Sequence, residues 1–227
     1  MEQKTKENIL YDNFLMRYFS SIYNNSSFNT CEIKNIAEVK NGYTFKPSEY
    51  LEETTFNDNI LEVLKMGHIS INGGLKLNPK KDYVERNEKI SKYILNENDI
   101  VLGMTDMKDK VVILGVPALI DKSNYYVLNQ RVARIISNTN NINPIILYYQ
   151  MRQQEFINTL RTKANSGVQV NLTTDSIKNM IVKVPTQNEQ HKIIKQIAPL
   201  VEIQKINNIE IKKLQDLKQK YLNKFFG

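Results

Sequence analysis

The chain has 227 residues and carries 31 lysines and arginines against 24 aspartates and glutamates, a formal net charge of +7. Its single cysteine, Cys31, excludes a disulfide framework and a cysteine-rich zinc cluster, and His68 and His191 are too far apart in the sequence to suggest a metal site. No apolar run reaches the roughly 18–20 residues of a membrane span, and residues 1–8 lack the apolar core of a secretory signal.

These properties favour a soluble chain in the cytoplasm. The basic excess is compatible with a polyanionic partner but does not require one, because many basic proteins bind nothing anionic. A chain of this length can bury about 70% of its unfolded surface, so it needs no metal or disulfide to fold. We therefore expect one sizeable domain with an appendage.

Residues 1–30 are expected to form a helix followed by a linker. Apolar side chains recur three and four residues apart, at Ile9, Leu10, Phe14, Tyr18 and Ile22. The polar stretch of residues 23–30 then breaks the pattern. This helix could pair with the C-terminal helix, either within the chain or between chains.

Residues 31–185 are expected to be rich in strands. Short apolar runs bounded by turn residues predict strands at residues 36–40, 59–66, 99–103, 111–116, 125–128, 131–136 and 180–184, and a strand with a tight turn at residues 69–75. Asn41-Gly42 is a turn signal that can supply a positive φ. The segment from Tyr43 to Pro47 is predicted to be an exposed loop of polar and aromatic residues.

One helix and one helical turn are predicted within this strand-rich region. Asn143 can cap a helix that has Pro144 at its first position. The apolar stripe of this helix consists of Ile145, Tyr149, Phe156 and Leu160. Thr173 is expected to cap a short helical turn at residues 174–179, just before the last strand.

The segment after Pro185 predicts a long helix. Thr186 and Glu189 have the spacing of a capping box, and the apolar pattern that follows lasts for about 60 Å of helix at the usual rise. A helix of this length cannot bury its stripe against one compact domain, so we expect a partner helix, with Pro199 as a position where the helix can kink. Two shorter helices packed on their own domain are the alternative. The predicted interface consists of Ile193, Ile197, Leu200, Ile203, Ile206, Leu214, Leu217, Tyr221 and Phe225.

No motif for catalysis is found. Gly73-Gly74 lacks the spacing of a nucleotide-binding loop. Asn143-Pro144 resembles the loop of amino-methyltransferases only faintly, because the second proline and the aromatic residue are missing. Asp99, Asp106 and Asp109 lie close to lysines, but the strand predicted next carries no acid, as a metal nuclease would require. We predict no catalytic residue and no metal ligand.

Polar loops between the strands suggest binding instead. Their Asn, Gln, Lys and Arg side chains gather at residues 40–46, 104–110 and 163–169. Amide side chains can read adenine, and lysine or arginine can read guanine or clamp phosphates. Solvated loops without a ligand explain the same pattern, so composition alone leaves both interpretations open.

Ordered segments of the chain resemble the specificity subunits of type I restriction–modification systems. The matching segments are residues 36–45, 61–69, 95–104, 128–135, 165–172 and 177–194, which together span nearly all of residues 31–200. No single segment is specific. The ordered set is more telling, since it ends in a strand, Pro185, the Glu189-Gln190 pair and a helix.

The resemblance implies an α+β fold with a strand-rich target recognition domain at 31–185 and a long spacer and dimerisation helix at 186–227, preceded by the N-terminal helix and linker at 1–30. Such a subunit is not an enzyme and binds no cofactor of its own; its methyltransferase partner uses S-adenosylmethionine. The candidate DNA-binding residues are Lys40, Asn41, Tyr43, Thr44, Lys46, Thr105, Lys108, Lys110, Lys163, Asn165, Ser166 and Gln169. Gln130 and Arg131 are left open between a DNA-facing role and a buried scaffold.

The length departs from the family pattern of two recognition domains and two helices. We therefore expect a half-size subunit that binds double-stranded DNA and the methyltransferase subunit, and that forms a homodimer or pairs with another half-size subunit. Whether a restriction subunit joins is left open. The alternative is a truncated or interaction-only relative that binds the methyltransferase or another specificity subunit without reading DNA. A nuclease or methyltransferase is disfavoured by the missing motifs.

Overall fold

The computed structural model describes residues 1–52, 57–107, 111–165 and 169–226. The chain divides into two compact units, residues 1–26 together with 186–227, and residues 27–185. Within the described residues, no helix is both long and apolar enough to cross a membrane.

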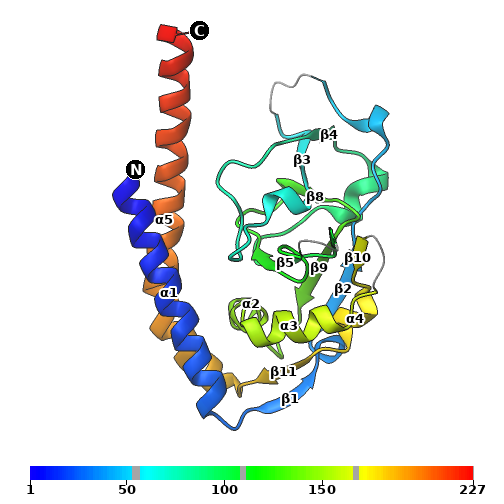
Figure 1. The fold of residues 1–227 in the computed structure, drawn as a ribbon, viewed down its shortest axis with the longest axis vertical. Coiled ribbons are helices and arrows are strands. Elements are labelled where there is room, and N and C mark those ends of the chain that lie inside the picture. Colours follow the sequence, from blue (N-terminus) through cyan, green and yellow to red (C-terminus); the bar gives the residue numbers. More distant parts are fainter. Residues whose placement is uncertain (53–56, 108–110, 166–168, 227) are drawn as a thin grey trace. The chain divides into compact units, whose positions relative to one another are not determined.

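The first unit is a pair of antiparallel helices, α1 (Glu2–Asn25) and α5 (Gln187–Phe226), shown in Figure 1. Lys4 near the start of α1 forms an ion pair with Glu210, whereas Tyr18 near its end donates to Gln196, so the two helices run in opposite directions. The capping box predicted for α5 is confirmed: the Glu189 carboxylate accepts from the Thr186 backbone N–H at 2.8 Å, and the Glu189 N–H donates to the Thr186 hydroxyl at 3.4 Å.

The stripe that α1 buries differs from the prediction. Leu15, Phe19 and Tyr23 are buried, whereas the predicted Leu10 and Phe14 are exposed. The side of α1 that faces α5 is set by polar residues as well as apolar ones, because Lys4 and Asn8 bond to α5 and fix the rotation of the helix. The predicted stripe is therefore only partly right: Tyr18 and Ile22 are half-buried and Tyr18 bonds to α5, whereas Leu10 and Phe14 face solvent.

The second unit is built from four small sheets (Figure 1). The largest is antiparallel, in the order β2 (Ala37–Asn41), β9 (Val132–Ser137), β5 (Ile100–Gly103) and β7 (Pro117–Leu119). A three-stranded sheet has the order β4 (Tyr83–Glu85), β3 (Ile60–Leu64) and β8 (Tyr126–Leu128). Two-stranded ribbons pair β1 (Asn29–Glu32) with β11 (Ile181–Val184), and β6 (Thr105–Met107) with β10 (Gln169–Asn171).

Short helices complete this unit: α2 (Pro144–Met151), α3 (Gln154–Thr162), α4 (Thr174–Lys178), and the 3-10 segments η1 (Ile33–Asn35), η2 (Pro47–Glu49), η3 (Met66–His68) and η4 (Glu88–Tyr93). The predicted caps are confirmed, since the Asn143 side chain accepts from Ile145 N–H and Thr173 accepts from Ser176 N–H. The single helix predicted from residue 144 is wrong, because Gln153 is extended and begins a second helix. The α+β class with a long C-terminal helix is confirmed.

Two of the apolar clusters in the core of this unit join its sheets. The larger contains Leu64, Val101, Leu128, Val132 and Ile157, from both major sheets and α3. A smaller cluster gathers Phe45, Leu61, Val84, Ile90 and Val127. Phe45 is therefore a core residue and Tyr43 packs half-buried against it, so the prediction of an exposed loop at residues 43–47 is wrong for its aromatic residues.

Two predicted strands are replaced by loops, because local hydrogen bonds hold the chain in turns. Residues 111–116 are not a strand: the Asp106 carboxylate accepts the N–H groups of Val112, Ile113 and Leu114, and Gly115 has a φ of 75°. At residues 69–75 the predicted tight turn is confirmed but the strand is not: Ile69 and Leu75 make a single bridge around Gly73 and Gly74, both at positive φ.

Candidate nucleic-acid interface

One end of the four-stranded sheet is where the predicted loops begin. Asn41 at the end of β2 is opposite Ala133 on β9, and Gly103 at the end of β5 is opposite Val132. The segment after β2, the turn before β9 and the strand after β5 therefore leave the sheet at the same end. Because antiparallel neighbours bring these ends together, segments about 60 and 90 residues apart in the sequence become adjacent.

Backbone hydrogen bonds join these segments to one another. The Gln130 N–H donates to the Tyr43 carbonyl at 3.0 Å, and the Met104 N–H donates to the Arg131 carbonyl at 3.0 Å. The turn of residues 129–131 is thus held between the other two segments. We call this end of the sheet the loop face: residues 41–46, 129–131, and the ribbon of β6 and β10.

Gly42 permits the close approach of two of these segments. A Cβ atom at this position would lie 2.2 Å from the Asn129 carbonyl oxygen, far inside van der Waals contact. Gly42 does not have a positive φ, so the conformation that this turn signal can supply is not used here. Glycine is required here by space rather than by backbone conformation.

The ribbon brings together two of the loops predicted to face DNA. Met107 on β6 is opposite Gln169 on β10, so these two residues form the tip of the ribbon. The base of the ribbon is tied to the sheet, since the Leu172 N–H donates to the Met104 carbonyl at 2.8 Å. The predicted contacts Lys108, Lys110 and Ser166 lie outside the described residues.

Asp106 fixes the chain beside the tip. Its carboxylate accepts backbone N–H groups from Met107 at 2.9 Å, Val112 at 2.7 Å, Ile113 at 2.6 Å and Leu114 at 3.2 Å. Burial alone would raise the pKa of Asp106, but these four donors outweigh it and hold the pKa below its usual value. The carboxylate therefore stays charged and acts as a structural acceptor.

Arg161 secures the same segment from α3. Its guanidinium donates to the carbonyls of Leu114 at 2.9 Å and Val112 at 3.1 Å. The segment around residues 112–114 is therefore held through both its N–H groups and its carbonyls. Neither Asp106 nor Arg161 was predicted to have this role, and the only sequence signal is an acid that directly precedes a polar loop.

The other predicted contact residues divide by exposure. Asn41, Thr44, Lys46, Lys163, Asn165 and Gln169 are exposed, as is Lys40, whose ammonium lies 2.9 Å from Glu38. Tyr43 is half-buried and donates to Glu49 at 3.1 Å, and Thr105 is half-buried with its hydroxyl 3.1 Å from the Met66 sulfur. Both Gln130 and Arg131 are exposed on the loop face, so the buried scaffold role left open for them is wrong.

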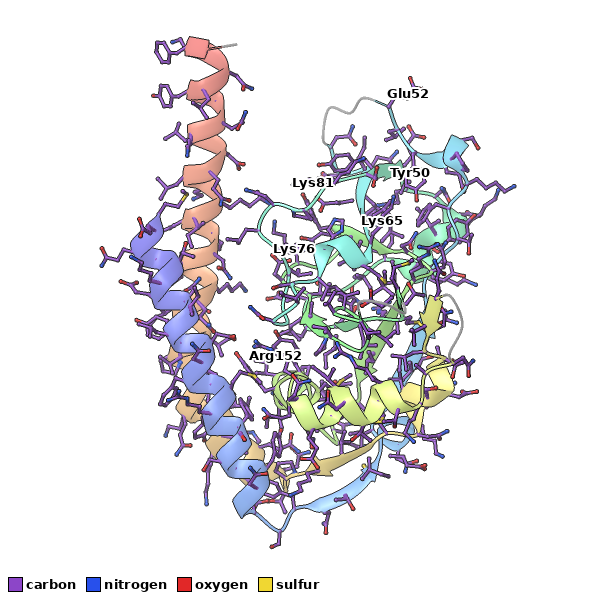
Figure 2. The ribbon with its side chains drawn as sticks, viewed as in Figure 1. Tyr50, Glu52, Lys65, Lys76, Lys81 and Arg152 are labelled. Atoms are coloured by element: carbon purple, nitrogen blue, oxygen red, sulfur yellow. The ribbon has the colours of Figure 1, made fainter. Side chains whose placement is uncertain are left out.

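The end of β3 adds another cation next to the loop face. The Lys65 ammonium lies 2.8 Å from Asp82 and 4.3 Å from the centre of the Tyr50 ring (Figure 2). The neighbouring Met66 contacts Thr105 of the ribbon, and the Leu64 carbonyl accepts from Asn129 N–H at 3.1 Å. The three-stranded sheet therefore also supports the 129–131 turn.

A buried acid lies beneath this cation. Glu62 is 2% exposed and accepts from His68 at 3.0 Å and from the Tyr125 hydroxyl at 3.2 Å, with the Lys81 ammonium at 3.4 Å. Burial alone would raise the pKa of Glu62, but the His68 hydrogen bond, the Lys81 charge and the Tyr125 hydroxyl lower it below its usual value. The backbone N–H of Lys65 donates to Nδ1 of His68, which leaves Nε2 as the donor to Glu62.

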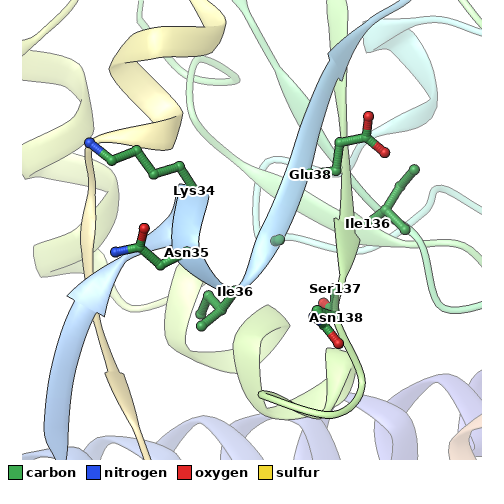
Figure 3. Close-up of a pocket in the computed structure, with 8 residues that line it drawn as sticks. Lys34, Asn35, Ile36, Glu38, Ile136, Ser137 and Asn138 are labelled. Atoms are coloured by element: carbon green, nitrogen blue, oxygen red, sulfur yellow. The ribbon is translucent and has the colours of Figure 1, made fainter.

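A hollow opens at the other end of the β2–β9 pair (Figure 3). Its lining comes from η1, the start of β2 and the end of β9, and consists of Lys34, Asn35, Ile36, Ala37, Glu38, Ile136, Ser137 and Asn138. Lys34 is already bonded to Asn179 at 3.2 Å and to Glu32 at 2.6 Å. Within the described residues no group of three or more His, Cys, Asp or Glu side chains could hold a metal ion.

The family is identified by the sequence as a whole. The model of the type I restriction modification DNA specificity domain matches residues 25–218, which is most of the chain. This chain belongs to that family. The domain confers DNA sequence specificity and has no catalytic activity of its own. Its loop face is accordingly a candidate DNA interface.

Solved structures have the same fold at low sequence identity. A chain from a study of complex assembly and conformational transition of the type I R-M system has a TM-score of 0.59 at 11% identity, covering 98% of this chain and 53% of that one. The S subunit from M. genitalium has a TM-score of 0.52 at 19% identity, covering 79% and 40%. The HsdS subunit from Thermoanaerobacter tengcongensis has a TM-score of 0.54 at 11% identity, covering 94% and 50%.

This specificity domain thus spans about half the length of the solved chains it resembles. A comparison with curated protein sequences found no significant match. The likeness to these chains is one of fold, and it agrees with the family shown by the sequence.

The helix pair of the specificity domain offers a second surface. The stripe of α5 that faces α1 is buried as far as Ile211, which is 1% exposed, but Leu214, Leu217, Tyr221 and Phe225 are 41, 49, 53 and 64% exposed. These four residues follow one another at helical spacing on the side of α5 that also carries the exposed Ile203 and Ile206, rather than directly in line with Ile211. Since Lys4 pairs with Glu210, α1 begins within about one turn of that position and leaves the rest of α5 uncovered.

The predicted helix interface therefore has two parts. Ile193 and Ile197 are buried within the chain, and Leu200 is half-buried. Ile203, Ile206 and the residues from Leu214 onward are exposed. We call Leu214, Leu217, Tyr221 and Phe225 the open stripe.

Proposed function

We propose that this chain is a half-size specificity subunit that reads one DNA half-site with its loop face and recruits an adenine methyltransferase through its helix pair. The observation that carries the proposal is the convergence of residues 41–46, 129–131 and the β6–β10 ribbon at one end of the sheet. Sequence-distant polar segments on a common rigid support are what base reading requires, because contacts must be held in register with the duplex.

Two exposed cations support DNA as the ligand: Lys46 belongs to residues 41–46, and Lys163 lies two residues before Asn165, which bridges to Asn171 of β10. Lys46 and Lys163 are exposed, and no ion pair holds either ammonium within the described residues. Lysine is a compact point charge suited to phosphate contacts, which supply most non-specific affinity and make it dependent on salt. The net charge of +7 on the chain favours the same partner.

The open stripe supports pairing with a second helix. Four large apolar side chains at helical spacing are costly to leave in water, at roughly 25 cal/mol per Å² of apolar surface. We propose that a second copy, or another half-size specificity subunit, covers the open stripe, so that two loop faces read a bipartite site. S-adenosylmethionine would be held by the methyltransferase partner, and a restriction subunit could join the same complex.

The direct test is co-expression with a type I methyltransferase subunit, followed by mapping of methylated adenines in the DNA of the expression host. A spaced inverted repeat is the expected motif, because two identical loop faces related by a two-fold axis read identical half-sites. An asymmetric motif would indicate that this chain pairs with a different specificity chain and not with a second copy of itself. Absence of methylation would contradict the proposal and favour an interaction-only role.

Phosphate contacts can be tested by salt dependence. Lys46→Ala and Lys163→Ala should each weaken DNA binding and reduce the slope of log affinity against log salt by about 0.9. Lys34→Ala is the matched control, since Lys34 precedes β2 and lies at the opposite end of the sheet from Asn41. Equal effects from all three variants would contradict the assignment of the loop face.

The dimer can be tested on the open stripe. Leu214→Asp with Leu217→Asp should give a soluble monomer by size-exclusion chromatography with light scattering, because a charge in an apolar helix interface is costly. Gln219→Asp with Asn223→Asp adds the same charge to exposed polar positions of the same helix and should leave the dimer intact. A dimer that survives the leucine substitutions would rule out this stripe as the interface.

A further inference from the structure

The turn between β8 and β9 is held on several sides. Asn129 N–H donates to the Leu64 carbonyl at 3.1 Å, Gln130 N–H to the Tyr43 carbonyl at 3.0 Å, and the Arg131 carbonyl accepts from Met104 N–H at 3.0 Å. Within the turn, the Asn129 side chain accepts from Arg131 N–H at 3.3 Å. The backbone of residues 129–131 is therefore bonded to the β3 end, the β2 end and Met104 at the base of the ribbon.

The two side chains on this fixed backbone are available to a ligand. Gln130 and Arg131 are both exposed, and the described residues offer neither side chain a hydrogen bond or an ion pair. Because the backbone is already fixed, a ligand that binds here has only the two side chains to order.

Arg131 differs in this respect from its neighbours in the same unit. Arg134 is buried against Asp99 at 2.7 Å, and Arg152 donates to the Asn72 carbonyl at 2.7 Å. Arg161 donates to Leu114, and Arg86 donates to the Asn124 carbonyl at 3.0 Å. In residues 27–185, as far as the structure describes them, Arg131 is the arginine whose guanidinium is not engaged by the protein.

The position of the pair favours base edges over phosphates. The turn lies between residues 41–46 on one side and the ribbon on the other, while Lys46 and Lys163 supply point charges elsewhere on the face. An arginine fork can donate to O6 and N7 of guanine, and a glutamine amide can pair with N6 and N7 of adenine. Adjacent side chains of these two types match neighbouring base pairs in the major groove.

We propose that Gln130 and Arg131 are specificity-determining residues that read bases at the centre of the half-site, with Arg131 on a guanine and Gln130 on an adenine. This assignment rests on the proposed function of the loop face. In this assignment Gln130 and Arg131 contact base edges, whereas Lys46 and Lys163 contact the phosphate backbone of the duplex.

The test is selection of bound duplexes from a randomised library by the purified full chain, comparing wild type with Gln130→Ala, Arg131→Ala and Lys46→Ala. Arg131→Ala should lower the preference for guanine at one position by roughly 10-fold or more and leave the other positions unchanged. Gln130→Ala should do the same for adenine at a neighbouring position. Lys46→Ala should weaken binding to all sequences alike.

Because both side chains are exposed and make no hydrogen bond to the described residues, the variants should retain the wild-type thermal unfolding curve. If both variants keep the base preference of the wild type, the assignment of Gln130 and Arg131 is wrong, although the proposed function of the loop face stands. A uniform loss of affinity in Arg131→Ala with a smaller salt slope would also overturn the assignment of Arg131, because it would indicate a phosphate contact. A wild-type chain with no sequence preference would overturn the proposed function together with this assignment.

Discussion

Asn207 on α5 donates from Nδ2 to Oδ1 of Asn8 on α1 at 3.0 Å, and its own Oδ1 accepts from Lys4 at 3.3 Å. Asn207 is 4% exposed, so this amide is buried with its partners. Asn8 also donates to Asn208 at 2.7 Å. A buried asparagine in a helix pair fixes register, because any slip leaves its amide without a partner.

Asn207→Ala should destabilise the helix pair by about 1–2 kcal/mol, because buried partners lose their hydrogen bonds. Asn8→Ala should have a similar effect, and the double variant should cost less than the sum, since each single change already breaks the shared bond. Urea unfolding followed by circular dichroism gives the three values. Strict additivity would contradict the coupling of these two residues.

Gly42→Ala should be among the more damaging small substitutions in the chain. The added Cβ would meet the Asn129 carbonyl at 2.2 Å, and a backbone atom cannot move aside as a side chain does. We expect a loss of about 1–3 kcal/mol in urea unfolding. Gly67→Ala is the matched control, because a Cβ added there would meet nothing within 4 Å among the described residues and the φ of Gly67 is not positive.

Asp106→Asn should loosen the segment beside the ribbon tip. Both carboxylate oxygens of Asp106 accept backbone N–H groups. The asparagine side chain has only one acceptor oxygen, and its NH2 group would face N–H groups that then have no acceptor. Amide hydrogen exchange at Val112, Ile113 and Leu114 should quicken by at least about 10-fold, in line with a lost bond to a charged acceptor. Asp58→Asn, at an exposed turn, should leave these amides unchanged.

The Glu62 cluster predicts acid sensitivity. Because the folded-state pKa of Glu62 lies below its usual value, its contribution to stability is present above the unfolded pKa of about 4.3 and is lost as pH falls through the folded pKa. Glu62→Gln should lower stability at neutral pH and flatten the decline in acid. Melting temperatures between about pH 3 and 7 measure this, and exposed Glu88→Gln should keep the wild-type profile.

Local sequence signals predicted much of the fold. The capping residues Asn143, Thr173 and Thr186 each satisfy a nearby N–H, and such bonds depend only on residues two or three positions apart. The family resemblance supplied the α+β class and the long helix. These features required no knowledge of which segments meet in space.

The errors arose where distant groups decide the conformation. Residues 111–116 have the composition of a strand, but Asp106 captures their N–H groups and holds them in turns. Phe45 follows a turn signal, yet it belongs to a core with Leu61 and Val127 from other strands. Apolar spacing along one segment contains no information about either partner.

The candidate DNA face was predicted as separate loops and not as one surface. Its assembly depends on pairing between β6 and β10, about 60 residues apart, and between β2 and β9, at a still larger separation. Gln130 and Arg131 could not be assigned to solvent or core from sequence, because their exposure follows from the bonds that Tyr43 and Met104 make to the turn.

The pairing of Met107 with Gln169 has a consequence for how new specificities can arise by genetic exchange. A crossover between these positions would join β6 from one parent to β10 from another, so two loops selected in different proteins would share one ribbon tip. Such hybrids should often lose recognition. Exchange that breaks the gene within the helices would transfer residues 27–185 intact, and these segments are where we expect productive recombination junctions.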